Sequence, residues 1–322
     1  MSVAEQAAAR TGERPALRLG LEWLFGPPAL LFVAFLAVPI AALAWRAGSS
    51  GELADNLTSS LVLDSLRLSA LTSTIVLAVA VLAGTPLAYL LARRDFRGKM
   101  AVDTLLDLPI VLPPTVAGVA LLVALGRRGL VGQELDSSGI DIAFTTTAVV
   151  LAQLFVSAPF YIRTAKAGFE SVEPVYEGVA STLGASPLRT FFRVTLPLAW
   201  PSLVAGAILC WARALSELGA TLIFAGNFQG RTQTMPLAII GAFEAGKSIE
   251  VPIALSVILV AAAAVLLLLL HRPIGSGEVD DVEGHAMGHT KGEKLGPGMP
   301  GTGGDLRATD DGTETDPHTE RA

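Results

Sequence analysis

Arg213 and Glu217 are the two charged residues inside a long apolar stretch, residues 198–224. They lie four residues apart, which places both side chains on one face of a helix and allows them to pair. An ionisable group at membrane depth is costly unless it is paired or faces water. At about 1.5 Å per residue from Pro197, the two groups lie roughly 24 to 30 Å along the helix, near its outer end. The pattern fits a structural ion pair, and it equally fits a translocation path in which Arg213 lends positive potential to the outer mouth.

The stretch from Gly241 to Ser248 matches the G-x-x-x-x-G-K-S pattern of phosphate-binding loops. Nucleotide binding there needs a preceding buried strand, a following helix whose N-terminus faces the phosphates, and an acidic partner for magnesium. This stretch instead leads through Pro252 into another apolar run. We therefore predict that the chain binds no nucleotide and is not an enzyme.

Cysteine and histidine usage argues against other kinds of site. A single cysteine, Cys210, cannot form an internal disulfide. The four histidines, at positions 271, 285, 289 and 318, all lie at or after the last apolar run. We therefore predict no metal site and no cofactor.

A polar-to-amphipathic segment, residues 174–197, separates two apolar runs, and we call it the insert. Val175, Val179 and Leu183 recur at i, i+4 and i+8 and so share one face of a helix. Gly184 suits the position just past a helix end, where glycine adopts the left-handed conformation without a Cβ clash. The pattern predicts a short helix with an apolar face, followed by a turn.

A second short helix is predicted after this turn. Ser186 can cap its N-terminus, and Pro187 fits its first turn, where a missing N–H costs nothing. Pro197 disfavours helical geometry in the residue before it, so the second helix is expected to end before Pro197. The insert should therefore be a stiff helix, turn and helix that forms a docking surface.

The rest of the chain must place these groups in a membrane. Of 322 residues, 52% are hydrophobic and only 16% are charged, and the mean hydropathy is +0.56, which indicates a polytopic membrane protein. A span needs about 20 apolar residues. Six runs predict six transmembrane helices, at about residues 25–45, 66–92, 104–125, 142–162, 198–224 and 252–270. A cleaved signal peptide is the alternative interpretation of the first run.

Lysine and arginine predict the orientation. With a cytoplasmic N-terminus, twelve of them lie in inside segments and five in outside segments, as the positive-inside rule requires. Both termini and the insert are then cytoplasmic. We predict a cytoplasmic N-terminal segment (1–22), a transmembrane domain (23–272) and a Gly-rich cytoplasmic tail (273–322). From residue 275 the tail holds eleven acidic and four basic residues and no aromatic one, so we expect it to be disordered.

The third predicted span contains Pro109, Pro113 and Pro114. Proline removes a backbone donor and strains a helix, which membranes tolerate where neighbouring helices or a cavity satisfy the freed carbonyls. These residues predict a kink. The kink serves helix packing in one interpretation, and in the other Pro113 and Pro114 line a translocation path together with Arg213 and Glu217.

The insert resembles the signature of the permease subunits of ATP-binding-cassette (ABC) importers, in which an acidic or small residue precedes Ala-Ala, a Gly and a later Leu-Pro. The matching residues are Glu177, Ala180, Gly184, Ala185, Ser186, Leu196 and Pro197. The resemblance implies an all-α membrane protein with the type I importer permease fold and about six transmembrane helices. It also implies that the insert is a cytoplasmic coupling helix docked on a separate ATPase. The ATPase-coupling residues would be Glu177, Ala180, Gly184, Ala185, Ser186, Pro187 and Pro197.

The same resemblance implies the partners. Two copies of the chain would form a symmetric pore in the cell membrane, surrounded by lipid, with one ATPase subunit on each copy. A loaded extracytoplasmic binding protein would sit on the outer loops. ATP binding would close the ATPase dimer and switch the cavity from inward to outward facing. We expect no nucleic acid partner.

Other stretches resemble the molybdate/tungstate branch of these permeases. They are residues 90–98, 108–114, 125–132, 216–221, 225–227 and 230–238. This resemblance implies an oxyanion as the cargo, most closely molybdate or tungstate, with sulfate or thiosulfate as the alternative. Arg127, Arg128 and Arg231 fall in outer loops, where they could meet an anion or the acidic rim of a binding protein, or could be solvated loop charges.

Two other classes of protein remain open. A secondary transporter would need intramembrane carboxylates and inverted repeats, but the sequence offers only Glu217 and no repeat. A membrane scaffold or sensor would depend on the acidic tail, so removing residues 275–322 would discriminate it from a transporter.

Overall fold

The computed structural model describes residues 15–50, 59–246 and 249–271, and all regular structure in these ranges is helical. The tail predicted at 273–322, and residues 1–14 of the predicted N-terminal segment, lie outside the described residues. The helices in chain order are α2 (Pro15–Ser50), α4 (Ser60–Arg93), α5 (Lys99–Val111), α6 (Pro114–Leu125), α7 (Gly132–Ser137), α8 (Thr146–Ser171), α9 (Pro174–Thr182), α10 (Pro187–Thr190), the π-helical turn η1 (Phe191–Thr195), α11 (Leu196–Leu215), α12 (Gly219–Ala225), α13 (Met235–Glu244) and α14 (Glu250–His271).

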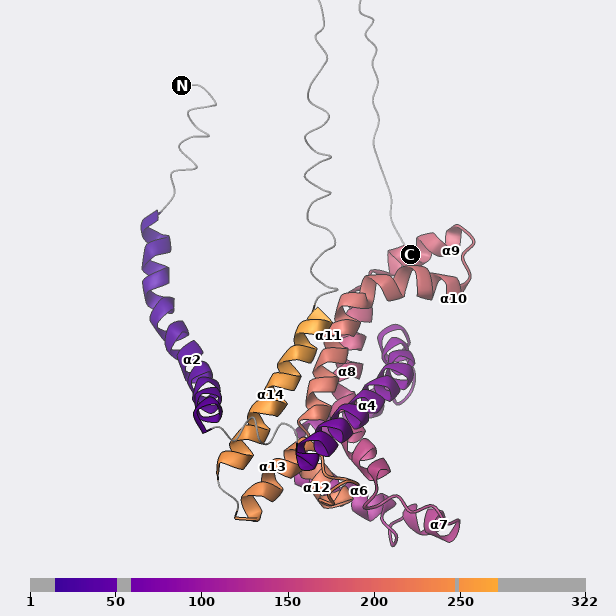
Figure 1. Cartoon of the computed structure of the whole chain (residues 1–322). Coiled ribbons are helices and arrows are strands. Elements are labelled where there is room, and N and C mark those ends of the chain that lie inside the picture. The colour runs from indigo at the N-terminus through magenta and orange to yellow at the C-terminus, as the bar shows by residue number, and fades with distance from the viewer. Residues whose placement is uncertain (1–14, 51–58, 247–248, 272–322) are drawn as a thin grey trace, which may run out of the picture. The chain divides into compact units, whose positions relative to one another are not determined.

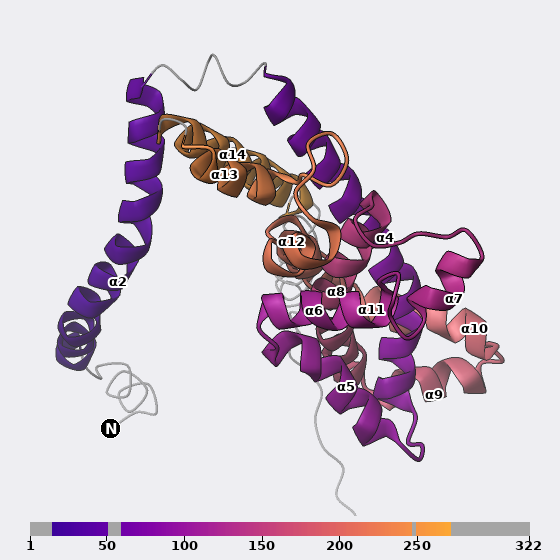
Figure 2. The same ribbon diagram turned by 90° about the horizontal axis from the view of Figure 1, so that it is seen from below.

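Helix α8 is the centre of the packing, with α4 on one side and α11 on the other (Figures 1 and 2). Their buried apolar side chains form one cluster, which includes Val76 of α4, Tyr161 and Phe169 of α8, and Leu203 of α11. All three helices are long and apolar enough to cross a membrane. Because lipid is as apolar as these side chains, close van der Waals packing across the shared face holds the three spans together.

A second apolar cluster joins α8 to α6 and α12. Helices α6 and α12 approach closely at Gly118: a Cβ built there would lie 2.9 Å from the carbonyl oxygen of Ala220 and 2.8 Å from Cβ of Ile223. Only glycine fits such a contact without displacing the partner backbone. A third cluster joins α13 and α14 to the start of α4.

Helix α2 contacts α14. Arg46, near the end of α2, donates from Nη2 to Glu250 Oε1 at 2.6 Å, at the start of α14. The apolar side chains of α2 that the structure describes, such as Leu30 and Phe35, are exposed within this single chain. Their exposure is what a helix facing lipid or another subunit would show.

The third predicted span is not one helix, which corrects the prediction of a kinked span. Helices α5 and α6 are bent by 119° at a break of two residues. Leu112 and Pro113 are both extended, with ψ of 135°. Each is followed by a proline, which disfavours the helical conformation in the residue before it. Two consecutive prolines therefore break the helix instead of kinking it.

The structure has a helix for each of the other predicted spans, but the first and last residues of these helices differ from the predicted ones. Among the described residues, the segments 25–49, 60–93, 146–171 and 187–215 can each cross a membrane, and α5 with α6 counts as a fifth, broken, span. Helix α14 corresponds to the sixth predicted run. The fifth run ends at Leu215, not at residue 224, because Ser216 to Leu218 turn the chain into the separate helix α12.

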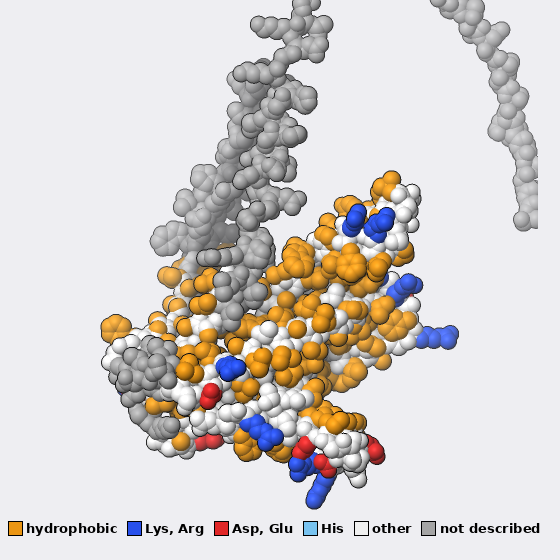
Figure 3. Space-filling model, turned by 45° about the vertical axis from the view of Figure 1, so that its right-hand side comes forward, with side chains coloured by type: hydrophobic (Ala, Val, Ile, Leu, Met, Phe, Trp, Pro, Cys, Tyr) orange, Lys and Arg blue, Asp and Glu red, His pale blue; other side chains and the backbone are white. Residues whose placement is uncertain are grey.

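The surface of the described residues matches a membrane location. Figure 3 shows apolar side chains over most of the visible face, with the Lys and Arg side chains mostly toward its edges. Such an arrangement leaves the charged groups at the two water interfaces and the apolar groups in the hydrocarbon layer.

Candidate coupling site

The first half of the insert forms the predicted helix and turn. Helix α9 begins with Pro174 in its first turn, and the chain reverses at Gly184, whose φ is +81°. The N–H of Gly184 donates to the carbonyl of Ser181, and the N–H of Ala185 donates to the carbonyl of Ala180, each at 3.0 Å. These two bonds satisfy carbonyls that the helix end leaves free. Gly184, Ala180 and Ala185 therefore shape the turn.

The second half of the insert begins as predicted but does not end as predicted. Ser186 accepts from the N–H of Arg189 and caps α10, with Pro187 in the first turn. The prediction that this helix ends before Pro197 is wrong, because α10, η1 and α11 follow one another without a break. In the π turn, the N–H of Leu196 bonds five residues back, to Phe191. Pro197 then occupies the first turn of α11, where its missing N–H is tolerated.

The predicted apolar face of the insert points away from the rest of the chain. Val175, Val179 and Leu183 are 57, 53 and 83% exposed, and Leu188 of α10 is 70% exposed. The insert extends from the ends of α8 and α11 at the edge of the structure in Figure 1. An exposed cluster of aliphatic side chains on a short helix is typical of a protein docking surface.

Glu177 does not share this exposed face. Its Oε1 accepts from Thr195 Oγ1 at 2.8 Å and lies 3.1 Å from Nη2 of Arg93, the last residue of α4. The same Arg93 nitrogen donates to the carbonyl of Val172 at 2.8 Å. Arg93 and Thr195 were not predicted as site residues. The available signal was the Arg93-Arg94 pair at the end of a predicted span, a position that favours orientation by the positive-inside rule as well as pairing.

Aromatic rings pack beneath this polar group. Tyr89 of α4 makes edge-to-face contacts with Phe169 of α8, at 5.4 Å between ring centroids, and with Phe191 of η1, at 5.0 Å. Edge-to-face pairs of this kind add about 0.5–1.5 kcal/mol beyond the burial of their surface. The insert is therefore connected to the spans by both apolar and charged contacts.

Arg213 and Glu217 are brought together as their spacing predicts. Arg213 Nη2 lies 2.7 Å from Glu217 Oε2, and Glu217 Oε1 accepts from the N–H of Ala220 at 2.9 Å. Glu217 follows the end of α11, is 1% exposed, and binds the first turn of α12. This geometry favours the structural interpretation of the pair. Pro114 packs nearby, since a Cβ on Gly219 would lie 2.8 Å from its Cβ, while Pro113 is exposed at the break before α6.

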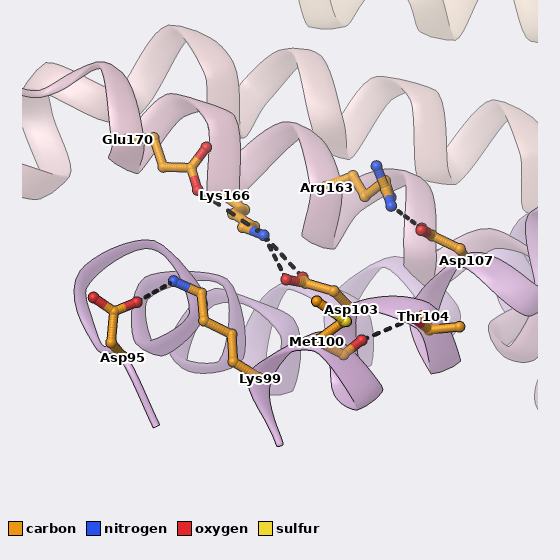
Figure 4. Close-up of polar contacts among 9 residues, drawn as sticks. All are labelled: Asp95, Lys99, Met100, Asp103, Thr104, Asp107, Arg163, Lys166 and Glu170. Carbon is orange, nitrogen blue, oxygen red and sulfur yellow. Dashed lines mark hydrogen bonds and ion pairs between the residues drawn. The ribbon is translucent and has the colours of Figure 1, made fainter. Parts of the chain in front are cut away.

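A ladder of ion pairs joins the first half of the broken span to α8 (Figure 4). Lys166 Nζ binds both carboxylate oxygens of Asp103, at 2.8 and 3.0 Å, and Arg163 pairs with Asp107 one turn further along. Beside these pairs, α5 and α8 enclose an apolar groove of about 470 Å³. Helix α5 is therefore attached to α8, whereas α6 packs against α12.

Two loops, one before α7 and one before α13, hold Arg127, Arg128 and Arg231. Arg127 pairs with Asp141, and its hydrogen bond holds the pKa of that carboxyl below the usual range, with a smaller contribution from Arg231. Thr146 Oγ1 donates to the carbonyl of Arg231 at 2.9 Å, so the two loops are joined. Arg127 and Arg128 line an open cavity of about 320 Å³.

The residues that match the phosphate-loop pattern begin inside a helix. Gly241 lies inside α13, and the helix ends at Glu244. A phosphate-binding loop needs successive backbone N–H groups that point at the ligand, which a helix interior does not offer. Residues 247 and 248 of the pattern lie outside the described residues.

Comparison with known families decides the class of the protein. The family of binding-protein-dependent transport system inner membrane components matches residues 84–274, more than half of the chain and including the whole insert. The chain belongs to this family. The prediction that it is the permease subunit of an ABC importer is thereby confirmed.

Individual relatives of this inner membrane component are permeases named for molybdenum or tungsten oxyanions. The chain is 42% identical over 249 residues to the molybdenum transport system permease protein ModB of Mycobacterium bovis, which covers 77% of this chain and 94% of the relative. It is 44% identical over 204 residues to the molybdate/tungstate transport system permease protein WtpB of Thermococcus kodakarensis, covering 63% and 77%.

Solved structures agree on the fold of this inner membrane component. A chain of a bacterial alginate ABC transporter, crystallised in complex with a periplasmic protein bound to an alginate pentasaccharide, matches with a TM-score of 0.65. The match covers 83% of this chain and 100% of the other at 18% identity. The predicted all-α fold of a type I importer permease is confirmed.

Proposed function

We propose that this inner membrane component imports molybdate or tungstate, driven by an ATPase subunit that docks on the insert. The observation that carries the proposal is the exposed apolar face of α9, borne on a segment that is bonded to the inner ends of α4 and α11. The named activities of the relatives in Mycobacterium bovis and Thermococcus kodakarensis support the cargo.

The docking surface for the ATPase is formed by Val175, Val179 and Leu183. These aliphatic side chains are large and exposed, on a short helix that begins with Pro174 and is capped at its C-terminal end by the turn at Gly184. A hydrophobic centre with a polar rim is the usual form of a protein interface, and basic Arg189 and Arg193 lie in the neighbouring α10 and η1. Gly184, Ala185, Ser186 and Pro187 serve this surface by shaping the turn between the two helices.

The assembly that we propose contains two copies of the chain in the cell membrane, with both termini in the cytoplasm. The excess of Lys and Arg in the inside segments supports this orientation. The apolar groove between α5 and α8, and the exposed side chains of α2, leave ample surface for lipid and for a second copy. The joined outer loops, with Arg127, Arg128 and Arg231, would receive the oxyanion-binding protein.

Uptake of radiolabelled molybdate tests the cargo. Cells carry this chain with its ATPase and binding protein, and tungstate or sulfate is added as a competitor. We expect tungstate at low concentration to abolish uptake and excess sulfate to leave it unchanged. Equal competition by sulfate would reassign the cargo to the sulfate branch, and absent uptake of any oxyanion would contradict the proposal.

Copurification of the ATPase tests the docking surface. Leu183→Asp places a charge at the most exposed residue of the apolar face, and we expect the tagged permease to lose the ATPase subunit. Leu130→Asp is the matched control, because Leu130 is equally exposed, at 85%, but lies in an outer loop. Retention of the ATPase by Leu183→Asp, or its loss in both variants, would rule out this surface.

A further inference from the structure

Arg93 contacts both ends of the short connection between α8 and α9. Its Nη2 donates to the carbonyl of Val172, the residue directly after α8, and lies 3.1 Å from Oε1 of Glu177, in the first turn of α9. The Arg93 side chain is 14% exposed. An ion pair that is partly shielded from water is screened less than a fully exposed pair. The angle at which α9 leaves α8 is thus set by a residue of α4.

Glu177 extends this connection to a third span. The same Oε1 that faces Arg93 accepts a hydrogen bond from Thr195 Oγ1 at 2.8 Å. Thr195 is buried and is the last residue of η1, directly before α11. One carboxylate oxygen therefore joins the end of α4, the first turn of α9 and the start of α11.

The aromatic contacts below this oxygen make the connection stiff. Tyr89 lies one helical turn before Arg93, and it packs against Phe169 near the end of α8 and against Phe191 at the start of η1. Bending at the joint between α8 and α9 would have to separate these rings and break the bonds of Arg93. A displacement of α9 is therefore transmitted to the spans instead of being absorbed at the joint.

We propose that Arg93 is a positioning residue that couples the insert to α4 through Glu177, so that α4, α8 and α11 follow the movement of the docked ATPase as one unit. This inference rests on the proposed function. It assigns Glu177 to the interior of the permease, where it relays movement, and leaves the contact with the ATPase to the apolar face of α9. It also gives the end of α4 a role in coupling, although α4 lies more than 80 residues before the insert in the sequence.

The test uses the full complex of permease, ATPase and binding protein in proteoliposomes. Arg93→Gln and Glu177→Gln each remove the ion pair, and glutamine at 177 keeps an acceptor for Thr195. Three quantities are measured: ATPase retained on the permease, ATP hydrolysis, and molybdate uptake per ATP hydrolysed. Arg94→Gln is the control. Arg94 is next to Arg93 in the sequence, but its own side chain is exposed and forms no ion pair among the described residues.

We expect both single variants to keep the ATPase and its basal hydrolysis, and to lower uptake per ATP by about tenfold. Because the two residues act through one contact, the double variant should lose about tenfold as well, not the hundredfold of two independent effects. Arg94→Gln should keep wild-type coupling. Wild-type uptake per ATP in Arg93→Gln, or multiplicative losses in the double variant, would overturn the inference.

Hydrogen–deuterium exchange separates failure of this inference from failure of the proposed function. Arg93→Gln should speed amide exchange in residues 172–182 of the purified permease, whatever the cargo. Wild-type complex that imports no oxyanion, together with faster exchange in the variant, would refute the cargo and keep Arg93 as the positioning residue. If amide exchange in Arg93→Gln is unchanged while the wild-type complex imports the oxyanion normally, the proposed cargo stands and the positioning role of Arg93 is refuted.

Discussion

The Glu217 carboxylate is shared between Arg213, in the last turn of α11, and the N–H of Ala220, in the first turn of α12. The carboxylate is almost fully buried, whereas the Arg213 side chain is 27% exposed. Burying a carboxylate is tolerable only when its charge is paired and its oxygens are bonded. This relationship makes the turn between the two helices depend on a charge pair.

Arg213→Gln should therefore destabilise the permease by about 3–5 kcal/mol, because it leaves the buried Glu217 charge uncompensated. The double variant Arg213→Gln/Glu217→Gln should recover most of this loss. Thermal unfolding of the purified protein measures both effects. Normal stability of the single variant, combined with reduced uptake, would instead support a role of Arg213 in the translocation path.

Gly184→Ala tests the turn of the insert. Open space surrounds this glycine, but its φ of +81° is unfavourable for a residue with a Cβ, at a cost of about 1–2 kcal/mol. We expect an inserted protein with weakened ATPase binding, measured by copurification. Gly178→Ala is the control, because Gly178 lies inside α9 with open space around it and alanine favours a helix there. Equal behaviour of the two variants would contradict the prediction.

Lys166→Met tests the attachment of α5 to α8. The substitution removes the pair with Asp103 and keeps a long aliphatic side chain. Because Lys166 and Asp103 are 22 and 29% exposed, we expect a modest loss of stability, about 1 kcal/mol or less. A double-mutant cycle with Asp103→Asn, followed by thermal unfolding, measures the coupling. Additive effects of the two substitutions would show that the pair makes no contribution.

The loop pair of Arg127 and Asp141 predicts a specific pH dependence. The hydrogen bond from Arg127 lowers the pKa of Asp141 in the folded protein. The pair therefore stabilises the loop above the unfolded pKa of about 3.9, and this contribution is lost only as the pH falls through the lower folded value. We expect amide exchange of residues 126–146, corrected for its intrinsic pH dependence, to show equal protection at pH 7 and pH 5. Asp141→Asn should reduce protection at both values, and reduced protection of the wild type at pH 5 would contradict this.

Local patterns predicted the insert well. The i, i+4, i+8 spacing of Val175, Val179 and Leu183 and the chemistry of Gly184 and Ser186 act within one or two helical turns, so a short window of sequence contains all the information. The apolar runs predicted the spans for the same reason. The relation between Glu177 and Arg93 was missed because it depends on how α4 packs beside α8, which no local pattern contains.

The wrong predictions concern prolines, whose effect depends on the surrounding structure. Pro113 and Pro114 break a helix because the two residues before them become extended and because α5 and α6 have different packing partners. Pro197 leaves its helix intact because the π turn before it rearranges the backbone bonds and places Pro197 in a first turn. Proline therefore disrupted the helix more than predicted at Pro113 and Pro114, and less than predicted at Pro197.

The π turn at Phe191–Thr195 fixes the rotational phase of the insert. A π turn accommodates one residue more than an α turn, and each residue rotates a helix by about 100°. The turn therefore absorbs the extra residue, whereas the same number of residues in regular α geometry would rotate α9 and α10 about the axis of α11 by that angle. The apolar face would then point away from the proposed ATPase partner. Chimeric importers that exchange inserts between permeases must therefore conserve the length of this turn as strictly as the docking residues themselves.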